Sequence, residues 1–287
     1  SIGNPGDLTY DYTLLGDDLS ELKNIFEDKS KITQQIKNSK KPIFIVGESA
    51  LELKNGSYIF EEMKNYLIKN KFISKDWNAL NVLIQNASTV GALDLGLYNI
   101  EKDNNFLFFD KLEKNHFKLL YLVGSDNLHI KKNNEFIIYQ GSHGDKNAAI
   151  ADVILPSAAY TEQDGLFTNI EGRVQECRKA SYPPNEAKED WQIFNLISKN
   201  LHNTNLFSDL FSIRNIILKN IPNFSEIDYL PIKNIKNETI NLNSIGNEKI
   251  ILKPIDYYFS NSIARASKTM SDCRNILLDI KKNGTNN

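Results

Sequence analysis

Short runs of apolar residues, each followed by small or polar residues, recur along this chain. Their hydrophobicity is continuous rather than alternating, which is typical of strands covered on both faces of a sheet. We predict strands at residues 42–46, 119–123, 136–139 and 152–155. The patterns at 57–69 and 76–85 predict helices between strands. This alternation favours an α/β fold with a mainly parallel sheet flanked by helices.

Later in the chain the period becomes helical. Pro183 and Pro184 break the chain, and Asn185 can cap a helix. Apolar residues then recur three or four positions apart, at Trp191, Phe194, Ile197 and Leu201. We interpret this stripe as the core-facing side of an amphipathic helix.

The last third of the chain divides into an irregular part and an ordered end. From 222 to 254 the periodicity fades among Asn, Lys and isolated Ile residues. A repeat of three and four then returns, ending before Gly284, a plausible helix cap. Its members are Ile263, Ala266, Met270, Cys273, Leu277 and Ile280. We therefore expect an α/β domain at 1–202, an irregular excursion at 203–255 and a C-terminal docking helix within 256–287.

Composition limits the classes of function. With 287 residues the chain can bury a large core. Its 34 basic and 36 acidic residues nearly balance, so no overall field recruits nucleic acid or an anionic membrane. No apolar run approaches the roughly 20 residues that cross a bilayer, so we expect no direct membrane insertion. Two cysteines are too few for an iron–sulfur cluster held by four thiolates.

The loop at 140–145 gathers a hydroxyl, an imidazole and a carboxylate after a predicted strand, in Ser142, His143 and Asp145. Neighbouring residues of one turn do not generally align as nucleophile, base and orienting group. The glycine spacing also departs from known phosphate-binding patterns. We interpret the loop as a structural turn in which His143 makes a hydrogen bond.

The remaining histidines and the cysteines give no metal site. His116, His129 and His202 lie far apart in the sequence, and a single nearby carboxylate would supply only a second ligand. We interpret Cys177 as a half-buried strand residue rather than a reactive thiol. Cys273 falls on the apolar stripe of the last helix and is expected to pack as a small core residue.

Polar residues crowd together between residues 151 and 175 more than hydrophobic patterning requires. They are Glu162, Asn169, Glu171 and Arg173, with Gly165 and Gly172 permitting tight turns. One interpretation is cofactor recognition, with Arg173 making a bidentate contact. The other is an internal network in which Arg173 pairs with Glu162 or Glu171. These residues alone leave both open.

The order ADVILPSAAYTEQDGLFTNIEGRVQ at 151–175 resembles the signature of the molybdopterin-oxidoreductase superfamily. Other motifs fall in the order of one member, the carboxy-terminal part of the large iron–sulfur subunit of mitochondrial respiratory complex I (NADH:ubiquinone oxidoreductase). They are DLTY at 7–10, LGD at 15–17, KKP at 40–42, SAL at 49–51, DW at 76–77, ALDLG at 92–96, YQGSHGD at 139–145, PP at 183–184, EDW at 189–191, DYY at 256–258 and SIARAS at 262–267. The resemblance spans nearly all of 7–275, and the Asn-rich segment at 203–250 matches poorly.

This resemblance implies a molybdopterin-oxidoreductase-like domain without catalytic chemistry. Such subunits carry their cysteine clusters in an amino-terminal part, which has no counterpart in this sequence, so we expect a split or partial subunit. In the mitochondrial family the corresponding domain has lost its metal cofactor and acts as support. We therefore expect no catalytic, cofactor-binding or metal-binding residue and no cofactor in this chain, with iron–sulfur clusters in a partner or in the missing part. Gly165 departs toward cofactor-binding relatives and keeps a vestigial pocket conceivable.

The expected function is that of a noncatalytic structural subunit in the peripheral, matrix-side arm of complex I at the mitochondrial inner membrane. There it would support the iron–sulfur chain that carries electrons from NADH to ubiquinone. It would be no enzyme by itself but a component of the proton-translocating oxidoreductase. The expected partners are other complex I subunits, above all the cluster-bearing amino-terminal portion, and no nucleic acid. The alternative is a lobe of an active molybdopterin-dependent oxidoreductase completed by another chain. A freestanding nucleotide-binding module rests on fold analogy alone.

Overall fold

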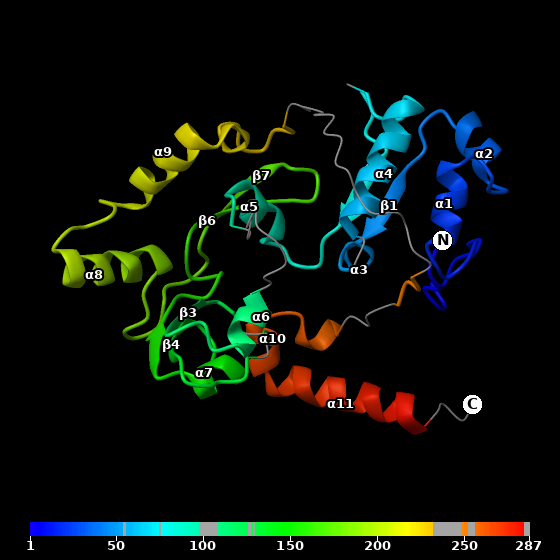
Figure 1. Ribbon diagram of the computed structural model, residues 1–287. Helices are drawn as coiled ribbons and strands as arrows, with labels where there is room; N and C mark the ends of the chain where they lie inside the picture. Colours follow the sequence, from blue (N-terminus) through cyan, green and yellow to red (C-terminus); the bar gives the residue numbers. More distant parts are fainter. Residues whose placement is uncertain are drawn as a thin grey trace. The chain divides into compact units, whose positions relative to one another are not determined.

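A computed structural model shows an α/β protein with parallel sheets flanked by helices, which confirms the predicted fold class (Figure 1). It describes residues 1–53, 56–74, 76–97, 108–125, 128, 130–231, 248–251 and 256–283. The chain forms two compact units. The first contains Ser1–Leu93, Thr168–Val174 and Asp228–Pro254, and the second contains Asp94–Phe167, Gln175–Ile227 and Ile255–Asn287. The three-part division expected from the sequence stays a prediction.

The first unit is built around a parallel pair of strands. Its elements are α1 (Ser20–Phe26), α2 (Thr33–Asn38), β1 (Phe44–Gly47), α3 (Glu48–Leu51), α4 (Gly56–Lys69), β2 (Leu80–Leu83) and most of α5 (Thr89–Asp94). Strand β1 pairs with β2 so that Phe44 lies opposite Leu80. The helix predicted at 57–69 is confirmed as α4. It begins at Gly56, where any side chain would collide with the backbone carbonyl of Leu51.

The helix predicted at 76–85 is wrong, because these residues contain strand β2. The indole nitrogen of Trp77 donates to the carbonyl of Pro42 at 2.9 Å, and Asn78 accepts from the backbone of Leu80 at 3.2 Å. Both contacts hold the segment extended beside β1. A short apolar run does not distinguish a strand from a helix until its pairing partner is known.

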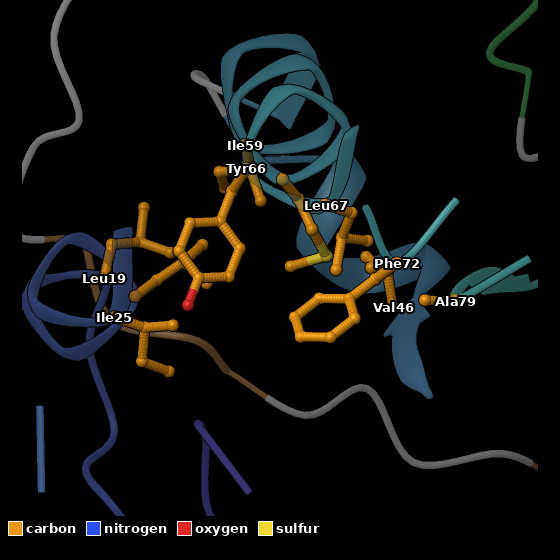
Figure 2. Packing of buried hydrophobic residues seen from close by; sticks show 10 residues of the cluster. Leu19, Ile25, Val46, Ile59, Tyr66, Leu67, Phe72 and Ala79 are labelled. Atoms are coloured by element: carbon orange, nitrogen blue, oxygen red, sulfur yellow. The ribbon is translucent and has the colours of Figure 1, made fainter. Parts of the chain in front are cut away.

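The core of the first unit lies on one face of this strand pair. It joins Val46 of β1 to the buried stripe of α4 and to the apolar side of α1 (Figure 2). Its buried members are Leu19, Leu22, Ile25, Val46, Ile59, Met63, Tyr66, Leu67, Phe72 and Ala79. In Figure 2, Val46 and Ala79 lie at one end of the cluster, close to Phe72. The spacing of Ile59, Met63 and Tyr66 along α4 is the helical period that the sequence predicted.

The second unit is built around a parallel sheet of order β3-β4-β5. Its elements are α6 (Phe108–Glu113), β3 (Leu119–Val123), β4 (Phe136–Gly141), α7 (Lys146–Ile150), β5 (Val153–Pro156), most of β6 (Gly165–Thr168) and β7 (Val174–Cys177), α8 (Asp190–His202), α9 (Leu210–Asn220), η1 (Pro222–Phe224), η2 (Tyr257–Phe259), α10 (Ser262–Ala266) and α11 (Lys268–Asn283). All four strands predicted from the apolar runs are confirmed, as β1, β3, β4 and β5.

The face of this sheet that bears the core carries Leu120, Leu122, Ile137 and Tyr139, all nearly inaccessible to solvent. On the opposite face, side chains such as Leu119 and Phe136 are about half exposed, at 53% and 46%. Toward the carboxyl ends of the strands, however, Gln140 on this same face is fully buried and Tyr121 stacks on Phe194 of α8, so within the described residues the second face is covered in part. The continuous hydrophobicity of these runs predicted the strands correctly, but it does not show which elements cover each face of the sheet.

The predicted helix after the proline pair is α8, but its boundary and its buried side differ from the prediction. It begins at Asp190 with Glu189 as N-cap, while Asn185 lies in a left-handed turn at φ 49°. Of the predicted core-facing stripe, Leu201 is 71% exposed, whereas Ile193 on another side is buried. The polar contacts at the start of the helix fix which of its sides faces the core, and the spacing of apolar residues carries no information about these contacts.

Two further helices refine the prediction for the end of the chain. Helix α9 has a capping box at Asp209 and Ser212, and no helix was predicted there. The C-terminal helix is confirmed, but extended backbone at Ser267 divides it into α10 and α11. Gly284, the expected cap, lies outside the described residues. Among the described helices, none combines the length and apolar character needed to cross a bilayer.

Candidate functional site

A buried amide links strand β4 to the start of helix α8. The side chain of Gln140 is fully buried; it accepts a hydrogen bond from the Tyr121 hydroxyl at 2.6 Å. Its amide nitrogen donates to Asp190 Oδ1 at 2.6 Å, and Gln163 donates to the other oxygen of Asp190 at 3.3 Å. Burial, and then the negative charge of Asp190, raise the pKa of Tyr121. The phenol therefore stays protonated and acts as a donor.

An ion pair lies beside this chain of hydrogen bonds. The ammonium group of Lys179 contacts Glu189 Oε1 at 3.0 Å, and the indole nitrogen of Trp191 donates to Glu189 Oε2 at 2.8 Å. Asp164 accepts from the backbone N–H of Lys179 at 2.8 Å. The hydrogen bond and charge of Glu189 raise the pKa of Lys179. We call the eight residues Tyr121, Gln140, Gln163, Asp164, Lys179, Glu189, Asp190 and Trp191 the α8 polar network.

Local sequence explains why α8 begins inside this network. Glu189 accepts from the backbone of Gln192, and the Gln192 side chain accepts from the backbone N–H of Glu189 at 3.3 Å. This reciprocal capping box satisfies N–H groups that the first helical turn leaves without partners. The carboxylates of Glu189 and Asp190 also lie at the positive end of the helix dipole. The EDW motif at 189–191 was visible in the sequence, but its network with Gln140 and Lys179 was not predicted.

The four residues of the 151–175 signature do not form one cluster. Glu162 accepts from the backbone of Ala159 at 2.9 Å and closes its own turn. Arg173 contacts Glu171 at 3.7 Å and donates to the carbonyl of Asp228. Of the two pairings expected for Arg173, the one with Glu171 is confirmed and the one with Glu162 is wrong.

Asn169 and Gly172 shape the turn between β6 and β7. The side-chain oxygen of Asn169 accepts from the backbone N–H groups of Glu171 at 2.9 Å and Arg173 at 3.0 Å. Gly172 has φ +83°, and a Cβ at this position would lie 2.9 Å from Pro231. Both the conformation and the space therefore require glycine here. Gly165 lacks a positive φ, and a Cβ there would meet Phe167 at an ordinary 3.6 Å, so its turn needs no glycine.

The loop at 140–145 does not assemble a catalytic triad. Ser142 lies 3.0 Å from His143 Nδ1, but the carboxylate of Asp145 turns away to cap α7 and to bind Arg265 Nε at 2.6 Å. Tyr139 donates its hydroxyl to the carbonyl of His143 at 3.1 Å. These contacts support the interpretation of the loop as a structural turn. They also show that Arg265 of α10 contacts Asp145 in the loop after β4, a pairing across 120 residues that no sequence pattern indicated.

Metal-ligating residues are dispersed in the part of the chain that the structure describes. There, no three His, Cys, Asp or Glu side chains gather in a geometry that could hold a metal ion. Cys177 and Cys273 are unbridged and half-buried, which agrees with the packing roles expected for them. His129 lies outside the described residues. The prediction that this chain contains no site residues stays a prediction.

One polar atom of the 151–175 signature, the hydroxyl oxygen of Thr168, makes none of these contacts. The hydroxyl of Thr168 is buried and has no hydrogen-bond partner among the described residues. Gly91 lies beside it, since a Cβ on Gly91 would be 3.6 Å from this hydroxyl. Buried hydroxyls normally find a partner. Thr168 is therefore the position in the signature with unused hydrogen-bonding capacity.

Comparison with known proteins identifies the family. A family model described as "Molybdopterin oxidoreductase" matches residues 1–200. The chain belongs to this family. A second model, which describes the C-terminal region of a subunit of NADH-ubiquinone oxidoreductase, matches residues 233–273. Together the two matches confirm the resemblance seen in the motifs, including the late one in the segment that contains Arg265.

The relatives are named as subunits of NADH-ubiquinone or NADH-quinone oxidoreductases. The chain is 36% identical over 283 residues to "NADH-ubiquinone oxidoreductase 75 kDa subunit" of Reclinomonas americana, covering 96% of this chain and 40% of the relative. It is 34% identical to the mitochondrial 78 kDa subunit of Candida albicans, covering 95% and 38%. It is 36% identical to a subunit of the NADH-quinone oxidoreductase of Rickettsia bellii, also covering 95% and 38%. The chain thus spans about two fifths of the length of these relatives.

Proposed function

We propose that this chain is a noncatalytic structural part of NADH:ubiquinone oxidoreductase, in the peripheral arm on the matrix side of the mitochondrial inner membrane. Its role is to support the part of the subunit that holds the iron–sulfur clusters. The names of the Reclinomonas and Candida relatives support the oxidoreductase, and the Candida name supports the mitochondrion. The match of residues 233–273 to the C-terminal model of an NADH-ubiquinone oxidoreductase subunit supports the same assembly.

One observation supports the noncatalytic role: the polar side chains of the site bind other groups of the same chain. In the α8 polar network, the ammonium group of Lys179 and the amide of Gln140 are directed at the carboxylates of Glu189 and Asp190. The guanidinium of Arg173 is directed at Glu171 and at a backbone carbonyl. Groups held in this way orient protein segments rather than a ligand.

The charge of the signature points in the same direction. Residues 151–175 carry one cation and four carboxylates, which are Asp152, Glu162, Asp164 and Glu171 against Arg173. Asp152 pairs with Lys132 at 2.6 Å and Glu171 pairs with Arg173 at 3.7 Å, while Glu162 and Asp164 accept backbone N–H groups. The single cation of the signature is thus already bound by Glu171 and by the carbonyl of Asp228, which does not suit it to hold an anionic pterin cofactor. The residues fit a framework whose charges satisfy one another.

The test is the native assembly. The chain, carrying an affinity tag, is expressed in its own cells, and membranes are solubilised in a mild detergent. We expect the chain to migrate in blue-native electrophoresis with the NADH-oxidising activity, and mass spectrometry to identify the cluster-bearing part of the subunit in the same band. Recovery of the chain only as a free polypeptide, or in an assembly without NADH-oxidising subunits, would refute the proposal.

The unused hydroxyl of Thr168 favours one alternative, a lobe of a molybdopterin-dependent oxidoreductase completed by another chain. This alternative requires molybdenum or tungsten and a pterin in amounts stoichiometric with the chain. Elemental analysis and fluorescence of the oxidised pterin, on the same purified band, decide between the two. The structural role predicts iron in the band and neither molybdenum nor tungsten bound to this chain.

A further inference from the structure

The end of the second unit, residues 256–283, is assembled largely through contacts of its own. Helices α10 and α11 make their main contacts with η2 and with each other. None of the described side chains in this range is buried, and the hydrophobic core of the second unit contains none of them. A segment with few buried apolar contacts can open locally while the rest of a unit stays folded. We call residues 256–283 the C-terminal segment.

A clamp around Phe259 holds the C-terminal segment together internally. The carboxylate of Asp256 accepts from the backbone N–H of Phe259 at 3.2 Å and pairs with the guanidinium of Arg274 on α11. The same guanidinium lies over the Phe259 ring, with its central carbon 4.7 Å from the ring centroid. Stacking and pairing together join η2 to α11 through side chains of the segment itself.

An ion pair fastens the C-terminal segment to the loop after β4. Arg265 Nε donates to Asp145 Oδ2 at 2.6 Å, and the two side chains are mostly covered, at 15% and 24% exposed. Arg265 also donates to the carbonyl of Phe259 at 3.3 Å. The other carboxylate oxygen of Asp145 accepts from the backbone N–H of Lys146, at the start of α7. Arg265 therefore connects the clamp around Phe259 with the turn between β4 and α7.

We propose that the C-terminal segment is a latch on the loop at 140–145, closed when Arg265 binds Asp145. Opening breaks this ion pair and releases η2, α10 and α11 as one piece, because the clamp around Phe259 moves with them. The β3-β4-β5 sheet stays folded, since its core takes no residue from the described part of the latch. The closed latch anchors the loop, and the open latch removes this anchor. This inference is independent of the proposed function.

Native-state hydrogen exchange of the full chain, followed by mass spectrometry of peptic fragments, tests the latch. We expect amides of α10 and α11 to exchange at least roughly tenfold faster than those of β3 and β4, through an opening of their own. Low concentrations of urea should hardly change this opening, because it exposes little surface. Exchange of both regions through one common opening would overturn the proposal, because the segment would then unfold only together with the sheet.

Two substitutions remove the anchor from its two sides. Arg265→Met removes the guanidinium, and Asp145→Asn removes the negative charge but keeps an oxygen that can cap α7. Each should speed exchange in α10, in α11 and at 140–145 by roughly tenfold, the effect of losing a charge-assisted hydrogen bond. Exchange in β3 and β4 should stay as in the wild type. If Arg265→Met leaves the exchange at 140–145 unchanged, the latch does not anchor the loop and the proposal is wrong.

A double variant and a control show whether the ion pair itself is responsible. Asp145→Asn combined with Arg265→Met should exchange as either single variant does, because both changes remove the same contact. Additive effects would contradict the assignment. The matched control is Arg178→Met, which removes an arginine side chain that is 83% exposed, and we expect it to leave the exchange of the latch and of the loop unchanged.

Arg274→Met separates the clamp from the anchor. It removes the pair with Asp256 and the stacking on Phe259 but leaves the contact between Arg265 and Asp145 in place. We expect faster exchange in η2 and α11 and unchanged exchange at 140–145. Exchange of the loop that rises as much as in Arg265→Met would refute the latch, because the loop would then respond to any loosening of the C-terminal segment.

Discussion

Replacing Gln140 by leucine tests whether the α8 polar network holds the second unit together. Leucine has nearly the size of glutamine, so Gln140→Leu fills the same buried space and removes only the polar contacts. The Tyr121 hydroxyl loses the acceptor at 2.6 Å, and Asp190 loses a donor at 2.6 Å. The substitution therefore separates hydrogen bonding from packing.

The magnitude follows from these two contacts. A hydrogen bond to a charged group contributes about 1.5–3 kcal/mol, and a neutral one contributes about 1 kcal/mol. We expect Gln140→Leu to lower the free energy of unfolding by about 3 kcal/mol. For a unit of 150–250 residues, 1 kcal/mol corresponds to roughly 2–4 °C, so the melting temperature should fall by roughly 6–12 °C.

The assay is thermal and urea denaturation of the full chain, followed by circular dichroism. Gln175→Leu is the matched control, because Gln175 is an exposed glutamine on strand β7, and we expect a change within about 0.5 kcal/mol. A double-mutant cycle with Asp190→Ala should give a coupling of about 1–2 kcal/mol between the two sites. A loss below about 1 kcal/mol, or an absence of coupling, would show that packing and not the network anchors α8.

Three further perturbations test other contacts. The hydrogen bond and charge of Glu189 raise the pKa of Lys179, so the stabilisation from this pair is complete below the unfolded pKa of about 10.4 and is lost as pH rises through the folded pKa. The variant Lys179→Met should therefore flatten the fall in melting temperature above about pH 10. An unchanged alkaline profile would contradict the pairing. In Gly172→Ala, a positive φ is combined with a 2.9 Å approach of the new Cβ to Pro231, so we expect the free energy of unfolding from urea titrations to fall by about 1–3 kcal/mol. The control is Gly144→Ala, where a Cβ would meet only ordinary contacts and the change should be small. Equal losses at both sites would refute the argument. Arg265→Met removes the ion pair that fastens α10 to the loop after β4, so limited proteolysis should cut between η2 and α11 several-fold faster, and an unchanged cleavage rate would show that other contacts hold this segment.

Local patterns predicted most of the strands because burial and composition act there together. The runs at 119–123 and 136–139 are apolar and bounded by polar residues, and they form β3 and β4 as expected. The run at 80–83 is also short but contains Asn81, and together with the residues around it the pattern suggested a helix. Its conformation depends on pairing with β1 and on the contact of Trp77 with Pro42, 35 positions earlier. A local pattern carries no information about such a partner.

In the candidate site, too, the sequence predicted which residues are polar but not which partners they bind. Glu162 and Arg173 are close in sequence and carry opposite charges, so pairing between them was a reasonable prediction. The structure instead uses Glu162 to close a turn and directs Arg173 to Glu171 and to the carbonyl of Asp228. Residues that the polar count did not single out, the buried Gln140 and the partly exposed Lys179, make the contacts at the start of α8.

The sequence by itself determined the α/β class, the family resemblance, the strand runs and the balance of charge, because these depend on composition and on short-range order. Only the tertiary structure decided which side of α8 is buried and which groups Arg173 and Asp145 bind. These outcomes depend on contacts between residues far apart in the chain, such as Asp145 with Arg265. The free energy of such contacts arises from geometry and burial that exist only after the chain has folded.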